Sequence, residues 1–184
     1  MPEEKGMCMG CGERLAEPSD ETLPLCSVCA KSAKESQRGV QFSKTRRAWS
    51  VSVYCRHEGA ILLILHKRLR MWIPVGGEIM EGETPLEAAH REVKEETGFS
   101  EVLFPSIHQV QCAPPGLLLY EEHAAKDKGL HMNFAFVAEV PDKRVKSDGS
   151  YTGMLWIPSM EEIPDPVPSN VLEALPYAFI AGIH

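Results

Sequence analysis

Three glutamates, Glu92, Glu95 and Glu96, stand within one five-residue stretch of the chain. In a helix, which turns about 100° per residue, their side chains gather on one stripe beside the apolar face. Like charges four residues apart, and carboxylates at the negative end of the helix dipole, each cost about a few tenths of a kcal/mol. Hard divalent ions such as Mg²⁺ prefer oxygen ligands and usually keep water and substrate phosphate in their remaining positions. The stripe therefore predicts a divalent metal site that meets a phosphate. A merely solvated acidic face is the alternative, but such acids would lie opposite the apolar face.

The segment before this stretch, residues 74–83, is rich in glycine and in acidic residues. Its glycines permit the backbone to approach an ion or a diphosphate closely. Residues 77–99 hold seven glutamates against Arg91 and Lys94, a net charge of −5 (2 − 7), and the whole chain has a net charge of −7. A bare site would repel an anionic substrate, so metal binding is expected to come first.

Clear start and stop signals mark the helix that must carry these acids. Thr84-Pro85-Leu86-Glu87 is a capping box with proline in the first helical position, and Gly98 is placed to end the helix, which predicts a helix over residues 85–97. A second helix is expected over residues 170–179, capped by Ser169 or Asn170. Strand-like runs cover residues 48–54, 60–65, 102–110, 117–120, 131–140 and 154–157. The sequence predicts an α/β fold with a mixed β-sheet and helices on its faces.

Four of the six cysteines form two tight pairs, Cys8 with Cys11 and Cys26 with Cys29. Each C-x-x-C turn can direct two thiolates at one tetrahedral ion, so the pairs predict a closed four-cysteine Zn²⁺ site. Two redox motifs are the alternative, but the thioredoxin-like strand–helix pattern that usually accompanies them is missing. The segment around the pairs has few large apolar side chains, so zinc would have to supply its folding energy.

Composition and spacing divide the chain into three parts. Residues 1–35 are predicted to form the small zinc-ribbon domain, residues 36–47 a polar linker, and residues 48–184 the main α/β domain. The single cysteines Cys55 and Cys112 lie in apolar surroundings, where inert thiols are usual, and are assigned no chemistry.

Charge and hydropathy limit the partners of the protein. The chain has 26 acidic against 19 basic residues, so it lacks the basic excess that drives non-specific binding to nucleic acid, and nucleic acid is not an expected partner. The longest apolar run covers residues 60–65, far short of the roughly 18 residues that would indicate a membrane span. The N-terminus is charged where a secretory signal would be apolar. We therefore expect a soluble, cytoplasmic protein.

The residues around the acidic helix resemble the Nudix box, G-x5-E-x7-R-E-U-x-E-E-x-G-U. Every fixed position of this motif is matched, by Gly77, Glu83, Arg91, Glu92, Val93, Glu95, Glu96, Gly98 and Phe99. The resemblance implies a Nudix α/β/α sandwich that hydrolyses a nucleoside diphosphate linked to another moiety, X, with Mg²⁺ or Mn²⁺. It also implies that Glu92, Glu95 and Glu96, with the carbonyl of Gly76, hold the ions. Arg91 would orient a carboxylate, and Glu83 would help to fix the loop.

Several residues outside the acidic helix are candidates for substrate contact or proton transfer. Lys67, Arg68 and Arg70 precede the box and could meet phosphate, as could the backbone of Gly77; Trp72 could line the pocket, although packing at the sheet edge is favoured. Nudix members place the general base differently, so a box glutamate is preferred and the distant candidates are Glu121, Glu122, His123, Asp127, Glu161 and Glu162. Many members read W-x-x-P-G-G before the box, whereas residues 72–77 carry the proline one place early.

The zinc ribbon helps to choose among substrates. A ribbon before a Nudix domain resembles NADH pyrophosphatases, but these carry an S-Q-P-W-P-F-P stretch after the box, where residues 111–116 read Q-C-A-P-P-G. Other zinc-ribbon members resemble ADP-ribose pyrophosphatases, so ADP-ribose or a related nucleotide sugar is the leading prediction and a (d)NTP is the alternative. A non-catalytic nucleotide sensor is the alternative of another class, although such proteins often have eroded boxes. The ribbon would either bridge to a second subunit, giving a homodimer, or cover the pocket.

Overall fold

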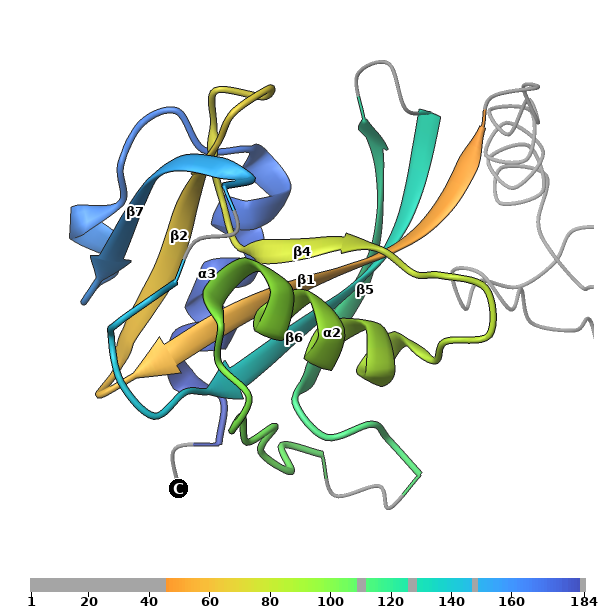
Figure 1. Ribbon diagram of the computed structural model, residues 1–184, viewed down its shortest axis with the longest axis horizontal. Helices are drawn as coiled ribbons and strands as arrows, with labels where there is room; N and C mark the ends of the chain where they lie inside the picture. Colours follow the sequence, from red (N-terminus) through yellow and green to blue (C-terminus); the bar gives the residue numbers. More distant parts are fainter. Residues whose placement is uncertain (1–45, 109–111, 126–128, 147–148, 183–184) are drawn as a thin grey trace, which may run out of the picture. The chain divides into compact units, whose positions relative to one another are not determined.

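The computed structural model describes residues 46–108, 112–125, 129–146 and 149–182 (Figure 1). The predicted zinc ligands Cys8, Cys11, Cys26 and Cys29 lie outside the described residues, as does most of the predicted linker. The elements follow in the order β1 (Arg47–His57), β2 (Ala60–His66), β3 (Trp72–Ile73), β4 (Val75–Glu78), α2 (Pro85–Thr97), β5 (Leu117–Ala125), β6 (Gly129–Glu139), β7 (Tyr151–Ile157), η1 (Met160–Glu162) and α3 (Ser169–Ile180).

Within the described part of the chain the strands form one seven-stranded sheet. Its order is β3-β2-β1-β6-β5, with β4 also paired to β1 and β7 to β2. β1 runs parallel to β6, whereas the other pairings are antiparallel. The predicted mixed sheet is therefore confirmed, and β1, which begins at the last residue of the predicted linker, is its central strand.

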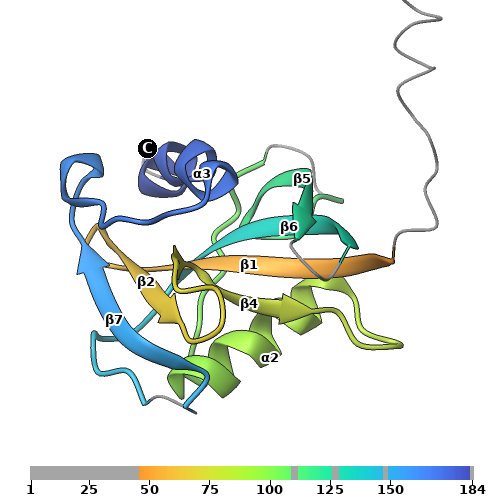
Figure 2. The ribbon, with the colours of Figure 1, turned by 90° about the horizontal axis from the view of Figure 1, so that it is seen from above.

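Helices cover both faces of the sheet (Figure 2). α2 packs over one face, on a core that includes Val51 and Val53 of β1. α3 packs over the other face, around Tyr54 of β1 and its own Leu175. Successive β1 residues thus point into opposite cores, as the period of two in a strand requires. The result is an α/β/α sandwich, and no helix among the residues described has the length and apolar character to cross a membrane.

α2 has the predicted bounds because the predicted capping interactions form at both of its ends. The hydroxyl of Thr84 accepts a hydrogen bond from the backbone N–H of Glu87, and the Glu87 carboxylate accepts from the N–H of Thr84 at 2.8 Å. At the other end Gly98 adopts the left-handed conformation with φ 78°, which a residue without a β-carbon adopts at little cost.

α3 occupies the predicted segment with one more residue at each end. The predicted cap is wrong, however, because Pro168 stands in the cap position without a side-chain hydrogen bond. Ser169 is already helical, and Asn170 uses its side chain elsewhere.

The sheet differs from the prediction in several places. β5 extends past the predicted residues 117–120 to Ala125, and β7 begins at Tyr151 and not at residue 154. In the described part of the predicted strand 102–110 only Leu103 pairs, through a single bridge to Glu139, and Pro105 has no N–H with which to continue a ladder. β3 and β4, in contrast, lie where no strand was predicted, and β4 falls in the segment before α2 for which the sequence indicated a loop. β4 is short and rich in glycine, so it lacks the alternating apolar residues that signal a strand. It forms because it pairs with residues 50–53 of β1.

A buried arginine joins the sheet to α3. Arg56 on β1 is 6% exposed, and its guanidinium donates to the carbonyls of Ala178, Phe179 and Ala181 at 2.8, 3.1 and 2.7 Å. It also donates to the carboxylate of Glu139 on β6 at 2.7 Å. Carbonyls at a helix C-terminus have no partner within the helix and carry the negative end of its dipole. Arg56 therefore caps α3 and fixes it against the central strand.

We expect Arg56→Met to lower the free energy of unfolding by about 3 kcal/mol, because it leaves the terminal carbonyls of α3 without their donor. Urea denaturation followed by circular dichroism would measure the change. Arg144→Met is the matched control, since Arg144 pairs with Asp142 at the surface and its loss should not be measurable. Equal destabilisation in the two variants would contradict the capping role.

Candidate active site

The glycine pair of β4 lies against the acidic helix. A β-carbon on Gly76 would lie 2.1 Å from the carbonyl oxygen of Val51 on β1, and one on Gly77 would lie 2.3 Å from Oε1 of Glu92 on α2. A side chain at position 76 would thus collide with backbone, and one at position 77 would push Glu92 aside. Glycine at both positions lets β4 pair with β1 and touch α2 at the same time.

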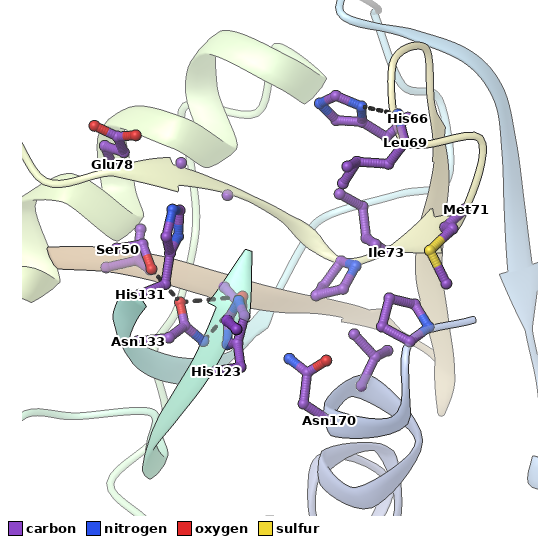
Figure 3. A pocket seen from close by; sticks show the side chains of 18 of the residues that line it. Ser50, His66, Leu69, Met71, Ile73, Glu78, His123, His131, Asn133 and Asn170 are labelled. Atoms are coloured by element: carbon purple, nitrogen blue, oxygen red, sulfur yellow. Dashed lines mark hydrogen bonds between the residues drawn. The ribbon is translucent and has the colours of Figure 1, made fainter. Parts of the chain in front are cut away.

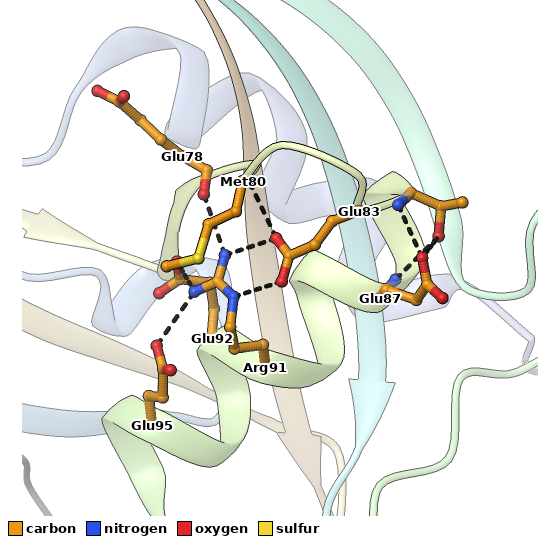
Figure 4. Close-up of polar contacts among 8 residues, drawn as sticks. Glu78, Met80, Glu83, Glu87, Arg91, Glu92 and Glu95 are labelled. Carbon is orange, nitrogen blue, oxygen red and sulfur yellow. Dashed lines mark hydrogen bonds and ion pairs between the residues drawn. The ribbon is translucent and has the colours of Figure 1, made fainter.

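One guanidinium, that of Arg91, organises the carboxylates (Figure 4). Its Nε and Nη2 donate to the two oxygens of Glu83 at 2.7 and 3.0 Å. Its Nη1 donates to Glu92 at 2.6 Å and to Glu95 at 3.1 Å, and Nη2 also donates to the backbone carbonyl of Glu78 at 3.0 Å. The charged fork of Arg91 therefore ties the loop after β4 to the acidic stripe of α2.

These contacts change the pKa of each group. Hydrogen bonds from Arg91 and from the backbone N–H of Met80 lower the pKa of Glu83 to about 2. Burial raises the pKa of Glu92, although Arg91 opposes this change. Hydrogen bonding to Glu83 raises the pKa of Arg91 well above its usual range, so the guanidinium is charged at neutral pH.

The three glutamates of the stripe do not share one environment. Glu96 is 8% exposed; its Oε2 accepts the backbone N–H of Gly76 at 3.0 Å, and its Oε1 accepts the hydroxyl of Ser150 at 3.2 Å. Glu92 lies against Gly77, whereas the side chain of Glu95 is 52% exposed. Two carboxylates are therefore held against β4 and the third faces solvent.

The chemistry of this cluster fits a hard divalent ion such as Mg²⁺ or Mn²⁺, because all of its side-chain donors are carboxylate oxygens. Within the described ranges, no three acidic, histidine or cysteine side chains already converge as an ion site. Arg91 instead contacts Glu92 and Glu95. An ion bound here would share Glu92 and Glu95 with Arg91, which contacts one oxygen of each.

A cavity of about 610 Å³ lies beside β4 (Figure 3), a volume in the range of small-molecule sites. Gly76 and Gly77 form part of its wall, so the same backbone borders both the cavity and the carboxylates of α2. Its remaining walls come from β1, the segment between β2 and β4, β5, β6 and the first turn of α3. Polar side chains from four of these elements reach it, namely Ser50, Ser52, His123, His131, Asn133 and Asn170.

A hydrogen-bonded network underlies this cavity. The amide of Asn133, 1% exposed, accepts from the Ser50 hydroxyl at 3.0 Å and donates to Oε1 of Glu121 at 2.9 Å. Asn170 donates to the same oxygen at 3.0 Å, and Nδ1 of His123 lies 3.6 Å from it. Burial acts to raise the pKa of Glu121, but the nearby ring of His123 and the hydrogen bonds from Asn170 and Asn133 outweigh it and the pKa is lowered. Glu121 is therefore a carboxylate at neutral pH.

The structure brings only some of the predicted substrate contacts to the cavity. Arg68 and Gly77 line it, whereas Lys67 and Arg70 do not. Arg70 lies in the tight turn between β2 and β3, with φ 55°. Trp72 on β3 packs against the apolar cluster beneath α3, which is the role that the sequence favoured.

Only some of the distant candidates for the general base lie at the cavity. His123 lines the cavity, and Glu121 contacts it through Asn170 and Asn133. Asp127 lies outside the described residues. The remaining candidates do not line the cavity: Glu122, which accepts the hydroxyl of Tyr120, and Glu161 and Glu162 of η1.

Sequence reasoning missed Ser50, Asn133 and the amide of Asn170 as site residues. Asn133 offered the one signal, because a lone amide in the otherwise apolar run of β6 must find partners when it is buried. Ser50 stands on a strand whose small residues carry no such signal, and Asn170 was assigned to helix capping.

We expect the carboxyl group of Glu83 to titrate near pH 2 in the folded protein, against an ordinary value of 4.5. Because the folded pKa is the lower one, the contribution of Glu83 to stability is complete above about pH 4.5 and is lost as the pH falls through about 2. NMR titration of the side-chain carboxyl would measure this pKa. Arg91→Met should return the midpoint towards 4.5, while Arg46→Met, which removes a pair with Glu78, should not. An ordinary midpoint in the unmodified protein would show that Arg91 does not hold this carboxylate.

Comparisons with known proteins give the family and the fold of the chain. The NUDIX domain model matches residues 44–172. A hydrolase of the NUDIX family from Clostridium perfringens has 23% identity and a TM-score of 0.64, over 73% of this chain and 97% of that chain. A MutT NUDIX hydrolase from Burkholderia pseudomallei has 19% identity and a TM-score of 0.58, over 72% and 98% of the two chains. A UDP-X diphosphatase has 16% identity and a TM-score of 0.56, over 81% of this chain and 70% of that chain.

These structural likenesses show the fold, and no curated protein sequence gives a significant match. The family match covers most of the chain and contains the glycine pair of β4, the loop that follows it and the whole of α2. On this evidence the chain belongs to the NUDIX family, as a Nudix-type hydrolase.

Proposed function

We propose that this protein is a Mg²⁺- or Mn²⁺-dependent pyrophosphohydrolase that cleaves a nucleoside diphosphate linked to X into a nucleoside monophosphate and a phosphorylated X. ADP-ribose, or a related nucleotide sugar, is the proposed substrate. The observation that carries the proposal is the double role of Gly76 and Gly77, whose backbone touches Glu96 and Glu92 and also forms a wall of the cavity. A diphosphate lying along this backbone would have its nucleoside in the cavity and its phosphates beside the carboxylates.

The proposed ligands of the divalent ions are Glu92, Glu95, Glu96 and the carbonyl of Gly76. When bound, Mg²⁺ or Mn²⁺ would neutralise the diphosphate oxygens and make a water molecule more acidic. The chain supports this by fixing the carboxylates beforehand: Glu96 is oriented by the N–H of Gly76 and the hydroxyl of Ser150. Arg91 favours the charged form of Glu92 against the effect of burial.

Proton transfer is proposed to use a glutamate of α2. Glu121 suits the role less, because its Oε1 already accepts two amide hydrogen bonds and its lowered pKa makes it a weaker base. Arg68, at the cavity wall, is the proposed cationic contact for a phosphate.

The choice among substrates can be tested directly. Turnover with Mg²⁺ should be compared on ADP-ribose, NADH, nucleotide sugars and dNTPs. Activity on ADP-ribose or nucleotide sugars supports the proposal, and activity on dNTPs alone replaces it with the (d)NTP alternative. A protein that binds these nucleotides without hydrolysing any of them would be a non-catalytic nucleotide sensor. The complete set of carboxylates on α2 argues against that alternative.

We also propose that Cys8, Cys11, Cys26 and Cys29 bind one structural Zn²⁺. The support is the spacing of the two pairs, since each C-x-x-C turn offers two thiolates to a tetrahedral ion. The ion would stabilise the fold of residues 1–35, which contain few large apolar side chains.

Glu96→Gln should reduce kcat on ADP-ribose by at least about a hundredfold, because an amide cannot replace a charged oxygen ligand. It should also weaken Mn²⁺ binding measured by calorimetry without substrate. Glu87→Gln is the matched control, since it makes the same change at the other end of α2 and glutamine can still serve the capping box. Undiminished hydrolysis by Glu96→Gln would remove this carboxylate from the mechanism.

Elemental analysis of the purified protein should find one zinc ion per chain. Cys8→Ser and Cys26→Ser should each lose it, because three thiolates hold Zn²⁺ less tightly than four. Cys112→Ser should keep it, since Cys112 is a free and exposed cysteine of the Nudix domain. Full zinc content in Cys8→Ser would contradict the four-cysteine site.

A further inference from the structure

His66, the last residue of β2, closes the turn that leads to β3. Its backbone N–H donates to the carbonyl of Met71 at 3.0 Å, and its carbonyl accepts from the N–H of Arg70 at 2.9 Å. Nδ1 of its ring also accepts the backbone N–H groups of Arg68 and Leu69, each at 3.2 Å. Figure 3 shows this ring beside Leu69 at one end of the cavity. One residue therefore makes four hydrogen bonds within the turn.

These bonds determine which ring nitrogen of His66 carries the proton. A nitrogen that accepts two N–H groups cannot itself carry a hydrogen, so the proton of the neutral ring is on Nε2. A ring carbon in the place of Nδ1 could not accept, so the ring cannot turn over without losing both bonds. The backbone of the turn therefore holds the ring in one orientation and one tautomer.

The turn needs such support because its backbone is strained. Arg70 adopts φ 55°, a left-handed conformation that is unfavourable for a residue with a β-carbon. Just beyond the turn the chain is anchored separately, since the N–H of Trp72 donates to the carbonyl of Pro166 at 2.9 Å. The first half of the turn is held by the ring of His66, so removal of the ring would loosen that half.

Only one of the three cations of the turn lines the cavity. Arg68 lines it, whereas Lys67 and Arg70 do not. The N–H groups that the ring of His66 accepts belong to Arg68 itself and to Leu69, which also lines the cavity. The ring thus binds the backbone at the point where the turn meets the cavity.

We propose that His66 is a positioning residue, which selects Arg68 among the cations of the turn as the contact for a phosphate of the substrate. This inference rests on the proposed function, which gives Arg68 that contact. Without the ring, the backbone of Arg68 and Leu69 would be free to turn, and the guanidinium would spend less time at the cavity wall. His66 acts through Arg68 and needs no contact with the substrate.

A double-variant cycle on the full chain tests the coupling between these two residues. Arg68→Ala should raise KM for ADP-ribose about tenfold with little change in kcat, because the contact is the same in the ground state and the transition state. His66→Ala should raise KM about fivefold. In the double variant the loss of His66 should add less than about twofold to the effect of Arg68→Ala, since the ring acts through the guanidinium. Independent effects would instead multiply to about fiftyfold.

Two further variants separate positioning from a loss of structure. His66→Asn should restore KM to within about twofold of the unmodified protein, because its Oδ1 follows Cγ as Nδ1 does and can accept the same two N–H groups. His57→Ala is the matched control. Nδ1 of His57 also bonds to backbone, 2.9 Å from the carbonyl oxygen of Val140, but His57 does not line the cavity, so KM should not change. Nitrogen NMR of the free protein at mildly alkaline pH should show the proton of His66 on Nε2.

The outcomes are distinct. An unchanged KM in Arg68→Ala, multiplied effects in the double variant, a KM in His66→Asn as high as in His66→Ala, or a proton on Nδ1 of His66 would each overturn the positioning role. If a dNTP is hydrolysed and ADP-ribose is not, the substrate proposal fails, and the same cycle on that dNTP decides the role of His66. If neither is hydrolysed, the proposed function fails, and the Kd of ADP-ribose measured by calorimetry takes the place of KM.

Discussion

The close contact between the glycine backbone of β4 and the carboxylates of α2 is the constraint on which the rest of the site depends. Gly76 has no room for a β-carbon beside the carbonyl of Val51, and a β-carbon on Gly77 would occupy the position of Glu92. The contact requires β4 to pair with β1 and α2 to pack on the same face of the sheet. Because the two glycines also border the cavity, a shift of β4 would disturb the carboxylate cluster and the cavity at once.

The charge of the cluster is compatible with folding because a single guanidinium contacts most of it. Arg91 contacts Glu83, Glu92 and Glu95, which partly compensates for like charges that would otherwise repel along one stripe. The compensation is incomplete, since burial still raises the pKa of Glu92. An arrangement that only stabilised the helix would carry fewer acids or place them in solvent. The excess of carboxylates is understandable when a cation supplies the remaining positive charge.

The sequence predicted the parts of the fold whose signals are local. The bounds of α2 follow from a capping box and a terminal glycine, and both act within one helical turn. β4 was missed because its two glycines remove the apolar alternation, and it exists only through its pairing with β1. The cavity was missed for a related reason: Asn133 and Asn170 are far apart in sequence and meet through Glu121. Charge alone made Lys67 and Arg70 candidates, but the direction in which a turn sends its side chains could not be predicted from charge.

The site has two parts, the carboxylate cluster beside β4 and the cavity. They differ in how freely their residues can be substituted. The carboxylate cluster is built mainly from β4, the loop after it and α2, and its geometry depends on backbone that admits no side chain. The cavity is assembled from β1, β5, β6 and α3, and its polar groups are joined by side-chain hydrogen bonds to Glu121. A partly buried carboxylate such as Glu121 is costly when it lacks partners. It holds two amides, so its removal would release the orientation of both together. Substitutions on β5 and α3 can therefore alter which nucleoside fits while β4 and α2 keep their contact, whereas any side chain on Gly76 would alter both.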